Sequence, residues 1–132
     1  MKRKLFRDPQ LQQTFDKDGF VVLNMLDKEK LAQLFQVLED LKEDKKNTNF
    51  TVDSDYKLSF FSDSKEYRAK VFDTISAFFR PLVDQYLEDY EPLIINTFDK
   101  ESGSGEVPVH QNWTFVDESK YTSVSVWIPL TD

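Results

Sequence analysis

The chain has 132 residues with a single His and no Cys, which excludes disulfides, thiolate zinc sites, cysteine nucleophiles and any site that needs two histidines from this chain. Its formal net charge of −7, from 17 basic and 24 acidic residues, would repel phosphate backbones and therefore disfavours nucleic-acid binding. The length is typical of a single domain, 1–132, and the three glycines leave no glycine-rich phosphate loop.

The first residues are basic, but they do not resemble a secretory signal. Lys2, Arg3, Lys4 and Arg7 come before any acidic residue, and no apolar run follows them. No segment approaches the roughly 18 apolar residues that a membrane span requires. We therefore expect a soluble, cytoplasmic protein that has no membrane partner.

A short helix and a strand are predicted near the start of the chain. Asp8 is suited to cap a helix whose first position is Pro9. This helix should run to about Asp16 and stop at Gly19. The β-branched, apolar run 20–23 then predicts a buried strand.

A second, longer helix is predicted after Asp27, which can cap it. Lys and Glu occupy one face of this helix, and the stretch Lys42 to Asn49 reads as a solvated loop. Apolar residues recur at helical spacing on the other face, at Leu31, Leu34, Phe35, Leu38 and Leu41.

A third helix is predicted after an irregular or weakly strand-like stretch, Phe50 to Phe61. Asp63 and Glu66, three residues apart, resemble an acidic capping box. Pro81 lies inside the helical pattern and predicts a kink or a break there. The apolar positions of this helix are Val71, Ile75, Phe78, Phe79, Leu82, Val83, Tyr86 and Leu87.

The last third of the chain predicts strands. Helices over 1–90 followed by a strand-rich part over 91–132 indicate an α+β fold, with helices packed on antiparallel strands. In order, we expect a strand at Leu93 to Phe98, a loop at Asp99 to Glu106, a strand at Val107 to Val116, a turn at Asp117 to Lys120 and a strand at Tyr121 to Leu130.

The final predicted strand has two different faces. Ser123, Ser125 and Trp127 share one of them, which either lines a ligand cavity or faces solvent with one half-buried Trp. The opposite face predicts core packing and consists of Thr122, Val124, Val126, Ile128 and Leu130.

His110 and Asn112 are candidate metal ligands. On a strand, residues two apart project the same way, so an imidazole and an amide oxygen could reach one ion. A lone His in a strand can equally be a structural residue that is satisfied by backbone groups. The residues alone leave both readings open.

Two separate sequence motifs, which occur in the same order as in the family, resemble the phytanoyl-CoA dioxygenase family of Fe(II)- and 2-oxoglutarate-dependent oxygenases. The longer run, VPVHQNWTFVDESKYTSVSVWIPLTD, spans Val107 to Asp132 and is similar to the family's His-Gln-Asp motif and its later Trp-x-x-Leu strand. The earlier run, Phe15 to Leu26 with its DGFVVL core, is similar to the family's opening helix and strand. The resemblance implies a double-stranded β-helix (a jelly-roll or cupin-like fold), of which this chain would be the N-terminal, incomplete part.

The resemblance also assigns roles to individual residues. His110 matches the first metal-binding His, and Asn112 stands at the position of the metal carboxylate. Gln111, Trp127 and, from the preceding loop, Lys100 match residues near the cosubstrate. The implied cofactors are Fe(II) and 2-oxoglutarate, and the implied reaction is hydroxylation of a small organic substrate. The resemblance assigns no further catalytic residue.

Two departures from the family pattern define an alternative. Asn112 is a neutral ligand where the family has a carboxylate, although Asp117 or Glu118 on the turn could substitute for it. The family's second metal-binding His and its cosubstrate Arg would lie beyond Asp132, so we expect this chain alone to be inactive. The alternative is a non-catalytic binding or interaction module on the same fold, and a generic α+β domain is a third reading.

An incomplete β-helix would leave strand edges unpaired, and such edges invite pairing with another chain. We therefore expect a homodimer through exposed strand edges, strand exchange or poor solubility. The alternative is a smaller closed fold.

Overall fold

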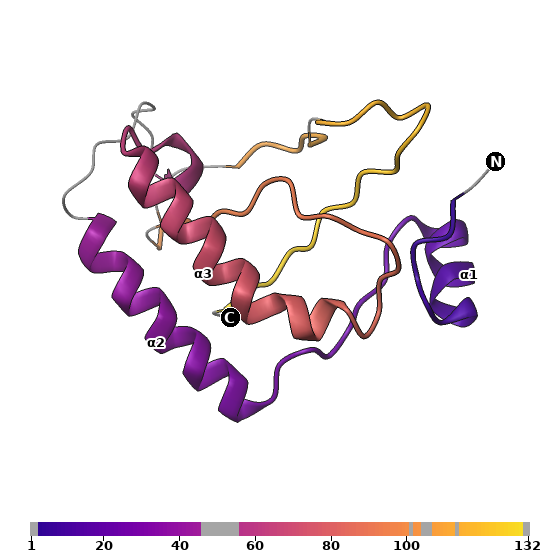
Figure 1. Ribbon diagram of the computed structural model, residues 1–132, viewed down its shortest axis with the longest axis horizontal. Coiled ribbons are helices and arrows are strands. Elements are labelled where there is room, and N and C mark those ends of the chain that lie inside the picture. Colours follow the sequence, from indigo (N-terminus) through magenta and orange to yellow (C-terminus); the bar gives the residue numbers. More distant parts are fainter. Residues whose placement is uncertain (1–2, 46–55, 101, 104–106, 113, 131–132) are drawn as a thin grey trace.

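The computed structural model describes residues 3–45, 56–100, 102–103, 107–112 and 114–130 (Figure 1). It is a mixed helix and strand structure, compatible with the predicted α+β class. Its elements are α1 (Pro9–Asp18), α2 (Lys28–Lys45), β1 (Tyr56–Leu58), the 3-10 helix η1 (Ser59–Phe61), α3 (Lys65–Val83) and β2 (Phe98–Lys100). Within this described part, none of the helices combines the length and apolar character needed to cross a bilayer.

Helix α1 is capped at both ends by the residues that the sequence indicates. The Asp8 carboxylate accepts a hydrogen bond from the backbone N–H of Gln10 at 2.7 Å, and Pro9 occupies the first turn. Gly19 closes the helix with φ of 81°, a left-handed conformation that glycine adopts without a Cβ penalty. Both cap predictions are therefore confirmed, although the helix reaches Asp18, two residues beyond the predicted end.

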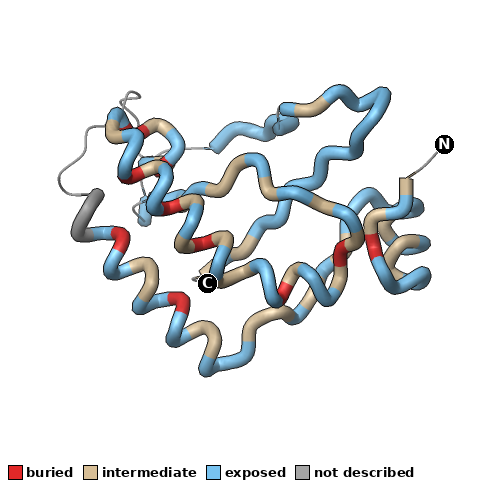
Figure 2. The backbone as a smooth tube through the Cα atoms, in the orientation of Figure 1, coloured by how far each residue is buried: buried red, intermediate tan, exposed pale blue. Residues whose placement is uncertain are grey.

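Helices α2 and α3 lie side by side and enclose the main core (Figures 1 and 2). The predicted apolar stripe of α2 is wrong at Phe35, whose side chain is 42% exposed. Leu34 and Leu41 are seven residues apart and share a face, whereas the next residue is turned about 100° away. The buried residues of this core are Leu34, Leu41, Tyr67, Val71 and Ile75.

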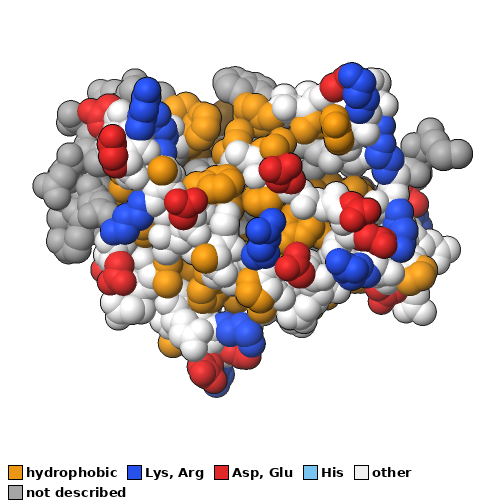
Figure 3. Space-filling model, viewed as in Figure 1, with side chains coloured by type: hydrophobic (Ala, Val, Ile, Leu, Met, Phe, Trp, Pro, Cys, Tyr) orange, Lys and Arg blue, Asp and Glu red, His pale blue; other side chains and the backbone are white. Residues whose placement is uncertain are grey.

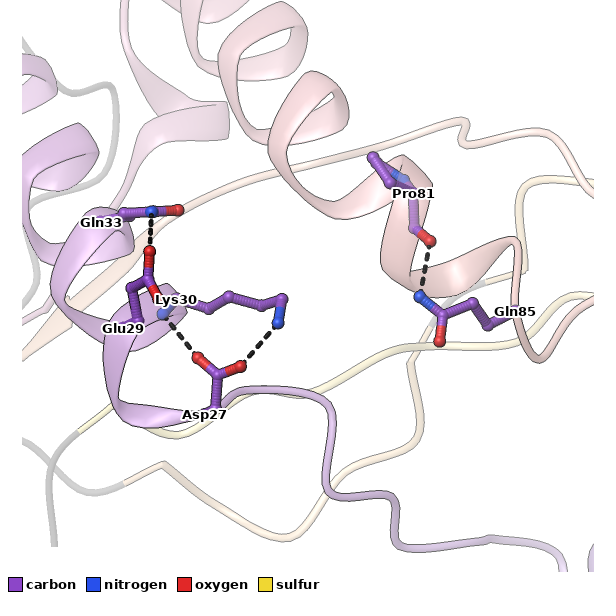
Figure 4. A network of polar contacts seen from close by, with 6 residues as sticks. All are labelled: Asp27, Glu29, Lys30, Gln33, Pro81 and Gln85. Carbon is purple, nitrogen blue, oxygen red and sulfur yellow. Dashed lines mark hydrogen bonds and ion pairs between the residues drawn. The ribbon is translucent and has the colours of Figure 1, made fainter.

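Helix α2 starts where the sequence indicates and ends later than predicted. The Asp27 carboxylate accepts a hydrogen bond from the backbone N–H of Lys30 at 2.8 Å and a second one from its Nζ at 2.7 Å (Figure 4). The helix continues to Lys45 and so includes the first part of the loop predicted from Lys42. The rest of that predicted loop lies outside the described residues.

The cap of helix α3 differs from the sequence expectation by one residue. Ser64, rather than Asp63, caps the helix, because its Oγ accepts a hydrogen bond from the backbone N–H of Tyr67 at 3.0 Å. Pro81 does not break the helix, which ends two residues later at Val83. Pro81 has no N–H to donate to the carbonyl four residues earlier, but α3 extends only two residues beyond it. The Pro81 carbonyl, one of those left unpaired at the helix end, accepts a hydrogen bond from Gln85 Nε2 at 3.0 Å (Figure 4).

The two short strands pair antiparallel, with Tyr56 opposite Lys100 and Leu58 opposite Phe98. Next to this ladder, Ser59 and Thr97 exchange two hydrogen bonds: the Ser59 N–H donates to the Thr97 carbonyl at 3.1 Å, and the Thr97 N–H donates to Ser59 Oγ at 2.9 Å. The weakly strand-like prediction before Phe61 is confirmed over 56–58, and its first part lies outside the described residues.

The predicted strands form only in small part. Of the strand predicted at 93–98, only Phe98 is in β2, and the strand predicted at 20–23 pairs with no other segment among the described residues. The strands predicted at 107–116 and 121–130 likewise form no ladder there. A strand needs a partner as well as suitable side chains, and these runs have none within the described chain.

The predicted turn at 117–120 does form, since the Asp117 carbonyl accepts hydrogen bonds from the backbone N–H groups of Lys120 and Tyr121, each at 2.9 Å. The expected core face of the last run is buried only near its end. Leu130 packs against the core between α2 and α3, whereas Val126 is 56% exposed. Figure 2 shows this C-terminal segment as largely exposed.

A second, smaller packing centre ties the start of the chain to the segment after α3. The backbone N–H of Arg7 donates to the Tyr86 carbonyl, and that of Glu88 donates to the Leu5 carbonyl, both at 2.8 Å. Phe6, between these two bonds, is buried. Residues of the basic N-terminal segment therefore make structural contacts.

Candidate functional site

His110 is exposed, and its ring is oriented by a backbone group. Its Nδ1 lies 2.8 Å from the carbonyl oxygen of Pro108. Because a carbonyl oxygen can only accept a hydrogen bond, Nδ1 carries a proton in this contact, and in the neutral ring Nε2 is then the nitrogen with the free lone pair. Metal-binding imidazoles commonly have this arrangement, in which one ring nitrogen donates to a carbonyl and the other faces the ion.

Asn112 is also exposed, and its amide is oriented by a residue from the last run. Its Nδ2 donates a hydrogen bond to Ser125 Oγ at 3.2 Å. This contact uses the amino group and leaves Oδ1, the atom that could coordinate a cation, to face elsewhere. It also places Asn112 next to one of the small polar residues of the predicted cavity face.

Trp127, a predicted cosubstrate residue, lies beside Phe98 of β2, the strand that also contains the second such residue, Lys100. The Trp127 ring centroid lies 6.2 Å from that of Phe98, with the planes tilted by 53°. Phe98 and Lys100 are two apart on a strand and so project to the same side. Trp127 is 75% exposed, so its face is open to solvent and does not line an enclosed cavity. Gln111 is exposed as well.

The predicted ligands fit a divalent ion only in part. His110 and Asn112 offer one nitrogen and one oxygen donor, but the regular strand expected to align them is not formed. Within the described ranges, no group of three His, Cys, Asp or Glu side chains is placed to hold a metal ion. The residues described here therefore do not complete an iron site.

Asp117, a candidate replacement for the missing carboxylate, is engaged in its own turn. Its Oδ1 accepts hydrogen bonds from Ser119 Oγ at 2.6 Å and from the Ser119 backbone N–H at 3.1 Å. Its Oδ2 pairs with Lys120 Nζ at 3.0 Å. These contacts, led by the Ser119 hydroxyl, lower the pKa of Asp117 and hold it as a charged part of the turn. Glu118 is exposed on the same turn.

A separate hollow of about 210 Å³ lies between η1, α3 and the segment 93–95. None of the predicted site residues lines it. The sequence does not predict this hollow. In the sequence, Arg68 is one of several charged residues of α3, and only the fold places it beside η1 and the segment 93–95. Its lining includes Ser59, Phe60, Arg68, Phe72, Leu93 and Ile95.

Hydrophobic side chains are also visible on the surface between scattered charges, as Figure 3 shows for one face.

Comparison of the chain with protein-family models, with curated proteins and with solved structures finds no match. The roles assigned to His110, Asn112, Gln111, Trp127 and Lys100 therefore rest on the order of the sequence motifs and on the contacts described above.

Proposed function

We propose that this chain belongs to a non-haem iron, 2-oxoglutarate-dependent oxygenase that resembles the phytanoyl-CoA dioxygenase family and hydroxylates a small organic substrate. The observation that carries the proposal is the His110 ring, whose Nδ1 donates to the Pro108 carbonyl at 2.8 Å, an arrangement that leaves Nε2 as the nitrogen available to a metal ion. The proposal includes a double-stranded β-helix as the complete fold and a cytoplasmic location.

In this proposal, His110 Nε2 and Asn112 Oδ1 supply two of the metal ligands. Lys100 and Trp127, both near the same side of β2, would contact 2-oxoglutarate, together with Gln111. A lysine supplies positive charge for a carboxylate, and an indole supplies a flat apolar wall. Bound iron with 2-oxoglutarate supplies the oxidising chemistry, while the protein binds, orients and shields the reactants.

The proposal is tested by measuring succinate formed from 2-oxoglutarate, under air and with added Fe(II), in the natural protein that carries this sequence. The test variant is His110→Ala. The control variant is Asn24→Ala, which truncates another exposed side chain, far from His110 in the sequence. We expect succinate formation that is lost in His110→Ala and retained in Asn24→Ala. Equal rates in all three proteins, or no succinate from any of them, would contradict the proposal.

A non-catalytic binding module is the second candidate, and Asn112 is the observation that favours it. An amide oxygen holds a divalent ion less tightly than a carboxylate does, since it carries no net charge. Calorimetric titration of this chain with Mn(II), as a stand-in for Fe(II), separates the two candidates. Tight binding would exclude the non-catalytic module, whereas ligand or partner binding without metal uptake would support it.

We also propose that the two C-terminal runs make this chain associate with a second copy. Residues 107–116 and 121–130 carry no Lys, Arg, Asp or Glu, so charge repulsion between copies is weak there. Among the described residues, their backbone groups take part in no strand ladder. Unpaired edges with apolar side chains are a template for strand pairing between chains.

A further inference from the structure

We propose that the hollow between η1, α3 and the segment 93–95 binds a small carboxylate with an apolar body, such as an aromatic or branched aliphatic acid. This site is independent of the proposed iron site, because His110, Asn112 and Trp127 do not line it. It requires a shaped apolar wall, a cation and a polar donor, and each of these is present in the lining.

The apolar wall comes from three separate parts of the chain. Phe60 from η1, Phe72 from α3 and the consecutive residues Leu93, Ile94 and Ile95 line the hollow. Phe60 and Leu93 remain 46% and 53% exposed, so a ligand would cover hydrophobic surface that now faces water. The volume of about 210 Å³ is below that of drug-sized sites, which limits the ligand to a single ring or a short branched chain.

Arg68 supplies the positive charge. Arg68 lines the hollow, and its Nη1 donates a hydrogen bond to the carbonyl of Ser62, a buried residue, which restrains the guanidinium. A guanidinium has five N–H donors in a planar fork, so one such bond leaves others for a carboxylate. In a chain with a net charge of −7, a held arginine beside an apolar wall selects a ligand that is both anionic and hydrophobic.

Ser59 supplies a second polar group. Its side chain is buried, with 2% of the residue exposed, and its Oγ accepts a hydrogen bond from the Thr97 N–H at 2.9 Å. A hydroxyl that accepts one hydrogen bond still has its own hydrogen to donate. The reciprocal bond from the Ser59 N–H to the Thr97 carbonyl, at 3.1 Å, holds η1 in place. Ser59 can therefore donate to a ligand without losing its structural contact.

The test compares phenylacetate with phenylacetamide, which has nearly the same shape and no charge, in an NMR titration of the whole chain. We expect phenylacetate to shift the Arg68 side-chain signal and the amides of Phe60 and Ile95, and to bind about tenfold more tightly than phenylacetamide, since hydrogen bonds to charged groups are the stronger ones. Equal affinity for the two probes, or shifts confined to other residues, would overturn the proposal.

The matched variants are Arg68→Gln and Arg80→Gln, which remove the same side chain from one helix inside and outside the lining. Arg68→Gln should weaken phenylacetate binding about tenfold and leave phenylacetamide binding unchanged, whereas Arg80→Gln should change neither. Arg68→Lys, which keeps the charge but not the fork, should give an intermediate affinity. Equal effects of the two glutamine variants would overturn the proposal, and if Arg68→Gln fails to fold, the comparison of the two probes decides.

Discussion

Asn112 and Ser125, thirteen residues apart in the chain, are joined by a hydrogen bond from the Asn112 amide to the Ser125 hydroxyl at 3.2 Å. The bond connects the segment that carries His110 to the last run, in which Ser125 stands two residues before Trp127. Because the amide donates through Nδ2, its oxygen is the atom left for a cation. The contact therefore both joins the two motifs and selects the amide face that a metal would meet.

Replacing Asn112 by Asp should strengthen metal binding. A carboxylate adds a negative charge at the position where the related family has one, and Ser125 can keep the contact by donating its hydroxyl hydrogen. We expect Mn(II) affinity to rise about tenfold, equivalent to about 1.4 kcal/mol. Calorimetric titration measures the change, with Asn24→Asp as a control of equal charge. The same gain in both variants would show that the effect is only one of net charge.

Leu34 and Phe35 are adjacent on α2 but should differ sharply in their contribution to stability. Leu34 is 2% exposed within the core between α2 and α3, whereas Phe35 is 42% exposed. Leu34→Ala should lower the free energy of unfolding by about 2–5 kcal/mol, and Phe35→Ala by less than about 1.5 kcal/mol. Urea denaturation followed by circular dichroism measures both. A larger loss from the Phe35 variant would contradict this core.

The pairing of Lys4 with Glu88 should make the N-terminal contact sensitive to acid. Lys4 Nζ lies 2.5 Å from Glu88 Oε2, and the lysine lowers the pKa of that carboxyl below its ordinary value of 4.5. A carboxyl with a lowered pKa in the folded state stabilises the fold above its ordinary pKa, and this stabilisation is lost as the pH falls through the lowered value.

Lys4→Gln should therefore raise the pKa of Glu88 toward its ordinary value and flatten the loss of stability below about pH 4.5. Carbon NMR of the Glu88 carboxyl gives the titration midpoint directly. Lys17→Gln removes an equal charge from an exposed residue of α1 and should leave the midpoint unchanged. An unchanged midpoint in the Lys4 variant would show that the ion pair does not form in solution.

Self-association should depend on the uncharged C-terminal runs. We expect light scattering to show dimers or larger species at high concentration, and Val126→Lys to reduce them, because a charge on an exposed edge opposes pairing. Gln13→Lys, on an exposed face of α1, adds the same charge elsewhere and should not change the distribution. A monomer at all concentrations would exclude association through these runs.

The sequence predicted the helices well because their signals are local. Asp8, Pro9 and Gly19 act within one turn of the backbone that they cap, so the ends of α1 could be placed to within two residues. The sequence indicates Asp63 as the cap of α3, whereas Ser64 caps it. Both residue types are suited to an N-cap, and the geometry of one hydrogen bond, from the Tyr67 N–H to Ser64 Oγ, selects between them.

The strands and the site contacts were harder to predict, because both depend on partners far along the chain. Alternating side chains favour a strand at 121–130, but a ladder requires a second backbone, which is not found among the described residues. His110 and Asn112 could be chosen by residue type, whereas the Asn112–Ser125 bond, and the hollow next to Arg68, are produced by the fold.

The most direct test of the metal site uses the fact that His110 is the only histidine among the 132 residues, so that its ring signals are unique in an NMR spectrum. Mn(II) added at low ratios should broaden the Hε1 and Hδ2 signals of His110 before those of the acidic turn at 117–120, and the effect should weaken in Asn112→Ala. Broadening of the turn signals first, with the His110 ring unaffected, would contradict the assignment of His110 as a metal ligand.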